Sequence, residues 1–164
     1  MLMKTTLFAA LGAVALAAPS LAQDVAEGEK QFGKCKACHM IVAPDGTEIV
    51  KGAKTGPNLY GVIGRVAGSL EGFKYGAGIE ELTAKGYVWT EADLAVYVQD
   101  PTKFLVEKTG DKKAKSKMMF KLKKEEDAKN VAAFLASLAP APDAAATDAA
   151  ATDAAAPAEG AVTE

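Results

Sequence analysis

The 164-residue chain contains only two cysteines and a single histidine, too few for a tetrahedral zinc site built from four Cys and His ligands. It also lacks an excess of basic residues, since 19 Lys and Arg face 21 Asp and Glu. The formal charge of −2 excludes a globally basic protein that coats nucleic acid. Sustained alternation of apolar and polar residues is lacking too, so the sequence favours helices over strands.

Hydrophobic residues make up 49% of the chain, and much of this excess lies at its two ends. Residues 1–22 combine a charged start at Lys4, an apolar run over 7–17, and small residues after Pro19. This pattern is typical of a cleaved secretory signal, whereas a membrane-spanning helix needs about 20 mostly apolar residues. The sequence therefore predicts cleavage before Gln23 and export to the periplasm of a protein that does not span the membrane.

The opposite end, residues 139–164, is rich in alanine and repeats the segment Asp-Ala-Ala-Ala-Thr. Because it has no aromatic residue and no leucine, it cannot bury enough apolar surface to offset the entropy lost on ordering. We expect a disordered tail, either a removable extension or a spacer. The domain between the two ends, residues 23–138, has 18 basic and 16 acidic residues and therefore a charge of +2.

Within this domain the sequence predicts short helices separated by long turns. A first helix is expected over 24–36, and a last one over 125–138 with a single apolar face. A third begins after the capping-box-like Thr90 and ends at Asp100-Pro101. Glycine and proline interrupt any periodicity over residues 40–65. We predict one small, mostly helical domain with a thin core of its own.

The segment Cys35-Lys-Ala-Cys38-His39 is the C-x-x-C-H signature of covalent haem c attachment. The spacing lets two thiols reach the two vinyl groups of one porphyrin, and the histidine that follows binds the iron. A disulfide between residues three apart is geometrically poor. A thioredoxin-like redox pair is expected near a βαβ pattern, which this sequence does not show. The motif predicts one covalent haem.

A haem iron bound by His39 has a further axial position, for which a methionine thioether is the natural candidate. No second histidine exists, and lysine is protonated at neutral pH. Two methionines lie in the predicted signal and Met40 adjoins His39, so Met118 and Met119 remain. With both positions filled, the iron is closed to oxygen and peroxide, which favours an electron shuttle over a haem peroxidase. A thiol oxidoreductase, the other alternative, would carry no haem.

From Gly28 to about Leu138, the chain resembles the class I c-type cytochromes, specifically the bacterial cytochrome c2 (c-550) branch. The motifs that carry the resemblance are, in chain order, Lys34-Cys-Lys-Ala-Cys-His39, Thr55-Gly-Pro-Asn-Leu59, Gly64-Arg65, Gly72-Phe-Lys-Tyr75, Trp89, Tyr97, Asp100-Pro-Thr-Lys103 and Lys117-Met-Met-Phe120. The resemblance implies an all-α cytochrome c fold, with short helices and long loops wrapped around one haem c. It implies a one-electron carrier rather than an enzyme.

The resemblance also implies roles for residues around the proximal side and the propionates. Pro57 would accept a hydrogen bond from the His39 ring and fix its orientation. Arg65, Tyr75 and Trp89 would bond to, or neutralise, a buried haem propionate.

On the distal side, the Lys-Met-x-Phe pattern assigns Met118 as the axial ligand. Tyr97 would donate toward the Met118 sulfur, and Phe120 would cover the haem edge. Ile79 is a departure, because many relatives have a polar Asn near this position.

Lysines gather close to the predicted haem: nine lie between residues 103 and 124, against only Glu107 and Asp111. The expected docking residues are Lys34, Lys36, Lys54, Lys103, Lys115 and Lys117. A positive ring would steer a monomeric carrier onto acidic sites, the alternative being a solvated run of charge. The expected transient partners are a bc1-type complex as donor and a cytochrome oxidase or photosynthetic reaction centre as acceptor.

Overall fold

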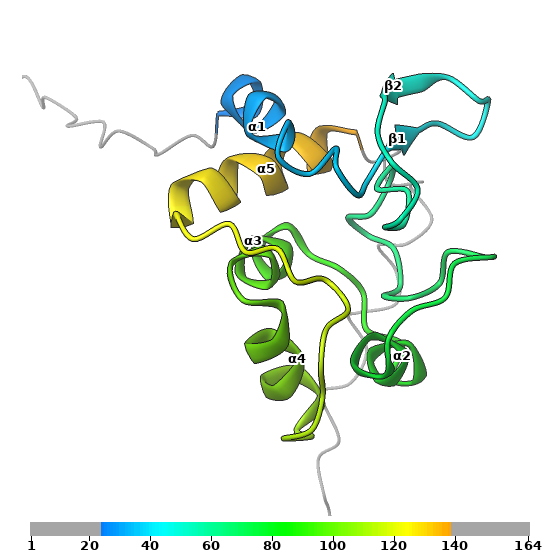
Figure 1. The fold of residues 1–164 in the computed structure, drawn as a ribbon, viewed down its shortest axis with the longest axis vertical. Helices are drawn as coiled ribbons and strands as arrows, with labels where there is room; N and C mark the ends of the chain where they lie inside the picture. The colour runs from blue at the N-terminus through cyan, green and yellow to red at the C-terminus, as the bar shows by residue number, and fades with distance from the viewer. Residues whose placement is uncertain (1–23, 139–164) are drawn as a thin grey trace, which may run out of the picture.

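The computed structural model describes residues 24–138 as a mainly helical domain with long loops, which confirms the predicted fold class. Its elements in chain order are α1 (Val25–Phe32), β1 (Ile41–Val42), β2 (Glu48–Val50), α2 (Ala77–Ala84), α3 (Glu91–Gln99), α4 (Pro101–Thr109) and α5 (Glu125–Ser137). Figure 1 shows α1 crossing α5 at one end of the molecule and α2 and α4 at the other. The predicted signal (1–22) and tail (139–164) lie outside the described residues. None of the helices in 24–138 has the length and apolar character needed to cross a membrane.

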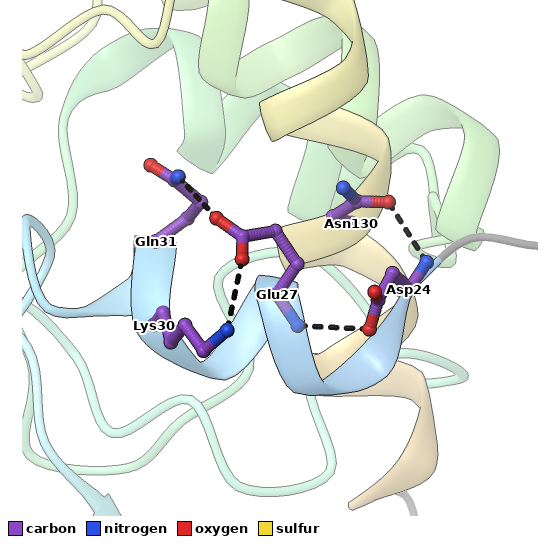
Figure 2. Close-up of polar contacts among 5 residues, drawn as sticks. All are labelled: Asp24, Glu27, Lys30, Gln31 and Asn130. Atoms are coloured by element: carbon purple, nitrogen blue, oxygen red, sulfur yellow. Dashed lines mark hydrogen bonds and ion pairs between the residues drawn. The ribbon is translucent and has the colours of Figure 1, made fainter.

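The crossing of α1 and α5 depends on small and polar residues at the contact. The backbone N–H of Asp24 donates to Asn130 Oδ1 at 2.9 Å, which ties the start of α1 to the middle of α5 (Figure 2). Gly28 lies directly against α5, because a Cβ at this position would overlap the carbonyl of Asn130. The rings of Phe32 and Phe134 pack beside it with centroids 5.6 Å apart. These contacts close one end of the core.

Side-chain caps set the bounds of α3 and α4. Thr90 Oγ1 accepts from the Asp93 backbone N–H at 3.1 Å, so α3 begins where the capping pattern predicted. Asp100 ends α3, and its carboxylate accepts from the Lys103 N–H at 3.2 Å to start α4. Pro101 occupies the first turn of α4, where its missing N–H costs no hydrogen bond. Asp100-Pro101 is predicted only as the end of a helix, and α4, which begins at Pro101, was missed.

One other local prediction was wrong, and two further elements were missed. The first helix ends at Phe32 instead of near 36, and turns follow over residues 33–38. The short antiparallel pair β1–β2 was not expected; it reverses at Gly46, whose φ of +87° suits glycine. The helix α2 was missed because its N-cap, Gly76, provides no side-chain hydrogen bond that would mark a helix start.

An aromatic cluster joins the chain before α3 to α3 and α4. Trp89 is buried and stacks on Phe104 with ring centroids 5.5 Å apart. Tyr97 packs edge-on against Trp89 at 5.0 Å and against Phe104 at 5.6 Å. Leu122 then donates its backbone N–H to the Val98 carbonyl at 2.8 Å, so the segment between α4 and α5 lies alongside α3. This packing positions the residues around Met118.

Candidate haem-binding site

The two cysteines and the histidine lie on consecutive turns that follow α1. The His39 and Cys38 backbone N–H groups both donate to the Cys35 carbonyl, at 2.9 and 3.0 Å. The two cysteines do not form a disulfide; Cys35 is half-buried and Cys38 exposed. Burial raises the pKa of the Cys35 thiol to about 11, whereas reactive redox cysteines have a lowered pKa. The raised pKa argues against a reactive redox dithiol at this site.

The His39 ring is fixed through one of its two nitrogens. His39 Nδ1 lies 2.9 Å from the Pro57 carbonyl oxygen, and because a carbonyl only accepts, Nδ1 carries the proton. The opposite nitrogen, Nε2, is then unprotonated in the neutral ring and can bind iron. Burial lowers the pKa of His39, which favours this neutral form. The predicted contact between Pro57 and the ring is therefore present.

Gly56 packs against the face of this ring, and replacing it by alanine tests the arrangement. A Cβ would lie 2.6 Å from His39 Nδ1 and 2.8 Å from Nε2, closer than real Cβ contacts, so the ring must move. We expect Gly56→Ala to lower the stability of the haem-loaded protein by about 1–3 kcal/mol. Guanidinium unfolding followed by haem absorption measures this change.

The matched control is Gly64→Ala, whose Cβ would meet nothing within 4 Å but whose φ of +83° makes the substitution strained. That substitution should lower the free energy of unfolding by about 1 kcal/mol through backbone strain alone, and it should leave the haem spectrum unchanged. Equal stabilities and identical haem spectra for the two variants would show that Gly56 does not position His39.

Arg65, which the resemblance assigns to a haem propionate, provides a half-buried positive charge. Its guanidinium donates to the carbonyls of Asn58 and Tyr60, both at 3.0 Å. No Asp or Glu in residues 24–138 forms an ion pair with it. Burial lowers the pKa of Arg65, while interaction with Tyr75 opposes that shift. A half-buried cation without a carboxylate partner in this part of the chain fits the anionic propionate of a haem.

Trp89 and Tyr97, which the resemblance assigns to a propionate and to the Met118 sulfur respectively, pack against each other in the aromatic cluster. The Tyr97 hydroxyl, however, lies 3.1 Å from Ser116 Oγ. Ser116 Oγ in turn accepts from the Met118 backbone N–H at 3.0 Å. Tyr97 therefore reaches the Met118 segment through Ser116, a residue that the sequence analysis did not single out.

The two candidate methionine ligands differ sharply in burial. Met118 is half-buried and packs against the hydrophobic core. Met119 is 85% exposed, and Phe120 is 41% exposed. Because an axial ligand must point into the haem crevice, this difference favours Met118.

The six predicted docking lysines divide into two groups. All six are exposed, and three of them form no side-chain hydrogen bond or ion pair with any residue in 24–138: Lys36, Lys54 and Lys115. The other three have partners within the domain. Lys34 lies 3.5 Å from Asp127 Oδ2, and Lys103 lies 3.8 Å from Glu107 Oε1. Lys117 bonds to backbone carbonyls, an arrangement that nothing in the sequence indicated.

Comparison with known proteins gives close relatives over more than four fifths of the chain. The chain is 60% identical over 142 residues to cytochrome c-550 of Paracoccus versutus, covering 84% of this chain and 91% of the relative. It is 61% identical over 137 residues to cytochrome c2 of Rhodobacter capsulatus, covering 83% and 98%. None of the protein-family models matches the chain.

Comparison of the fold with solved structures finds the same relatives. The crystal structure of ferric cytochrome c-550 from Paracoccus versutus matches with a TM-score of 0.68 and 63% identity, over 71% of this chain and 98% of the other. The chain thus belongs to the cytochrome c2 and cytochrome c-550 family, whose members are electron-transfer proteins with one covalently bound haem c.

Proposed function

We propose that this protein carries single electrons in the periplasm through a haem c attached to Cys35 and Cys38, with His39 and Met118 as axial ligands. The observation that carries the proposal is the Cys35–His39 turn, in which the His39 ring is oriented by Pro57 with Nε2 left for iron. The bound haem supplies the one-electron redox change between ferric and ferrous iron.

The surrounding residues would hold this haem in a fixed environment. Arg65 would neutralise a propionate, with Tyr75 beside it. Ser116 would hold the Met118 backbone, and Tyr97 would steady Ser116 from α3. With His39 and Met118 both holding the iron, the protein would keep oxygen and peroxide away from it, as an electron carrier requires.

Location and processing form a separate part of the proposal. The charged start, apolar run and small residues of 1–22 support export and cleavage before Gln23. Intact mass spectrometry of the exported protein tests this directly. The expected mass is that of residues 23–164 plus one haem, or of a shorter chain if the tail is removed. A mass that retains residues 1–22 would contradict the cleavage proposal.

Docking would use the lysines that remain free around the haem motif and the Met118 segment, above all Lys36, Lys54 and Lys115. Their charges complement acidic surfaces such as those we propose on a bc1-type donor and on an oxidase or reaction-centre acceptor. Encounter between such surfaces is fast at low salt and slows as salt screens the charges.

Replacing Lys115 by glutamine is expected to lower the association rate with such a partner roughly twofold to fivefold at low ionic strength. The effect should fade at high salt, because it is electrostatic. Stopped-flow kinetics over a range of ionic strengths measures both changes.

The matched control, Lys129→Gln on α5, removes the same charge from a lysine that already pairs with Glu125 at 2.6 Å. Equal effects of the two substitutions at every salt concentration would indicate that net charge matters and that the Lys115 face does not.

A further inference from the structure

Three exposed lysines lie close together around the Cys-x-x-Cys-His turn, and we name them the proximal lysine group: Lys36, Lys51 and Lys54. The Ala53 backbone N–H donates to the Lys36 carbonyl at 3.0 Å, which ties its segment to that turn. A Cβ at Gly52 would lie 3.1 Å from the same carbonyl oxygen, so the two segments are in contact. None of the three lysines forms a side-chain hydrogen bond or ion pair within the described domain.

The acidic residues nearest to this group along the chain do not neutralise it. Asp45 and Glu48 lie in the β1–β2 hairpin, and neither pairs with a lysine of the described domain. The Asp45 carboxylate accepts from the Thr47 backbone N–H at 2.9 Å. Lys34, by contrast, has an acidic partner, since its Nζ lies 3.5 Å from Asp127 Oδ2. The proximal lysine group therefore offers its charge to an anion from outside residues 24–138.

The chain leaves the described domain close to this group. The end of α1 lies beside the second half of α5, where the rings of Phe32 and Phe134 have centroids 5.6 Å apart. Lys36 follows Phe32 by four residues, and Leu138, the last described residue, follows Phe134 by four. In Figure 1 the end of α5 lies at the end of the molecule that also holds α1 and β1. The segment over 139–164 therefore begins near the proximal lysine group.

This segment carries the opposite charge, and its first acidic residues are within reach. It contains no Lys or Arg, and its acidic residues recur every five or six positions: Asp143, Asp148, Asp153, Glu159 and Glu164. A chain spans at most about 3.6 Å per residue, so Asp143 can lie up to about 18 Å from Leu138 and Asp148 up to about 36 Å. Because the segment is joined to the domain, its carboxylates act at an effective concentration on the order of millimolar.

We propose that the acidic segment over 139–164 binds the proximal lysine group of its own chain and competes there with acidic partners. The contact lowers the positive charge that steers such partners, and it therefore slows their association at low salt. The contact itself depends only on the charges and on the connection through Leu138. Its effect on electron transfer rests on the proposed docking use of Lys36 and Lys54, and the two parts have separate tests.

Cross-linking of the full-length, haem-loaded protein with a water-soluble carbodiimide tests the contact, because this reagent joins a carboxylate directly to an adjacent amine. In the monomer fraction, we expect peptides carrying Asp143 and Asp148 to be linked to the proximal lysine group at least about fivefold more often than to Lys113. Lys113 is the matched reference, since it is exposed, has no side-chain partner within 24–138 and follows α4 at the opposite end of the domain.

The cross-links should disappear in about 1 M salt, where the Debye length falls to about 3 Å. Equal linkage to Lys113 and to the proximal lysine group would overturn the contact. Linkage that persists in 1 M salt would contradict its electrostatic origin.

Oxidation of the ferrous protein by hexacyanoferrate(III) tests the effect on docking, because this anion takes one electron from the haem iron and leaves as hexacyanoferrate(II). Combining Asp143→Asn with Asp148→Asn is expected to raise the second-order rate constant about twofold at low ionic strength. The matched control, Glu29→Gln with Glu126→Gln, changes the net charge equally at exposed positions of the domain and should raise it less. Equal rate constants for the two double variants, or cross-linking without any change in rate, would retain the contact and contradict its control of docking.

Discussion

Replacing Met118 by alanine is expected to abolish the long-wavelength absorption band of thioether-bound ferric iron. It should also lower the reduction potential by an amount on the order of a few hundred millivolts, because axial ligands set haem potentials over a wide range. A thioether favours reduced iron, so its loss stabilises the ferric form. The vacated position should then bind added imidazole or cyanide, which the parent protein binds poorly. Spectroelectrochemical titration and ligand titration measure these changes.

Met119→Ala is the matched control for this prediction. It removes the same side chain from the adjacent position, but Met119 is 85% exposed and lies outside the core. The band and the potential should remain close to those of the parent protein. Loss of the band in Met119→Ala alone would reverse the ligand assignment, and loss in neither variant would remove methionine from the proposed coordination.

Replacing Gly28 by alanine is expected to lower the free energy of unfolding by about 3 kcal/mol or more. The added Cβ would overlap the Asn130 carbonyl and lie 2.9 Å from Phe134 Cβ, so α1 and α5 must separate. Separation weakens the contact of Phe32 with Phe134 and strains the Asp24–Asn130 hydrogen bond. Guanidinium denaturation followed by far-ultraviolet circular dichroism measures the loss.

The direction of the change in the free energy of unfolding tests the contact directly. Replacing Gly by Ala inside an exposed helix normally stabilises the protein by about 0.5–1 kcal/mol, so a loss of stability points to the contact with α5. A control on the same helix is Glu29→Ala, at an exposed position that does not face α5, where we expect a change within about 0.5 kcal/mol. Unchanged or increased stability for Gly28→Ala would contradict the close approach of α1 and α5.

Local signals in the sequence were enough to predict some helices and not others. The capping residue Thr90 predicts the start of α3, and the apolar face over 125–138 predicts α5. The start of α2 was missed because Gly76 carries no capping side chain. The start of α4 was missed because Asp100 and Pro101 both end α3 and begin α4. From sequence alone, this pair was interpreted only as the end of a helix.

The site shows the same division between local and long-range information. The spacing of Cys35, Cys38 and His39 is contained in five residues, so their proximity follows from sequence alone. The hydrogen bond of Lys117 to the Tyr75 carbonyl spans 42 residues, and no local pattern distinguishes this lysine from neighbouring lysines that form no such bond. Likewise, only the structure identifies Ser116 as a site residue, through its hydrogen bond with Tyr97.

Proton NMR of the reduced, haem-loaded protein with carbon-13 labels on the methionine methyl groups tests the central claim most directly. The account predicts one methyl resonance shifted far upfield by the haem ring current, absent from Met118→Ala and present in Met119→Ala. The methyl group of Met119 should resonate near the position of a solvated methionine. A spectrum with no ring-current-shifted methionine methyl group, or with one that disappears only in Met119→Ala, would contradict axial ligation by Met118.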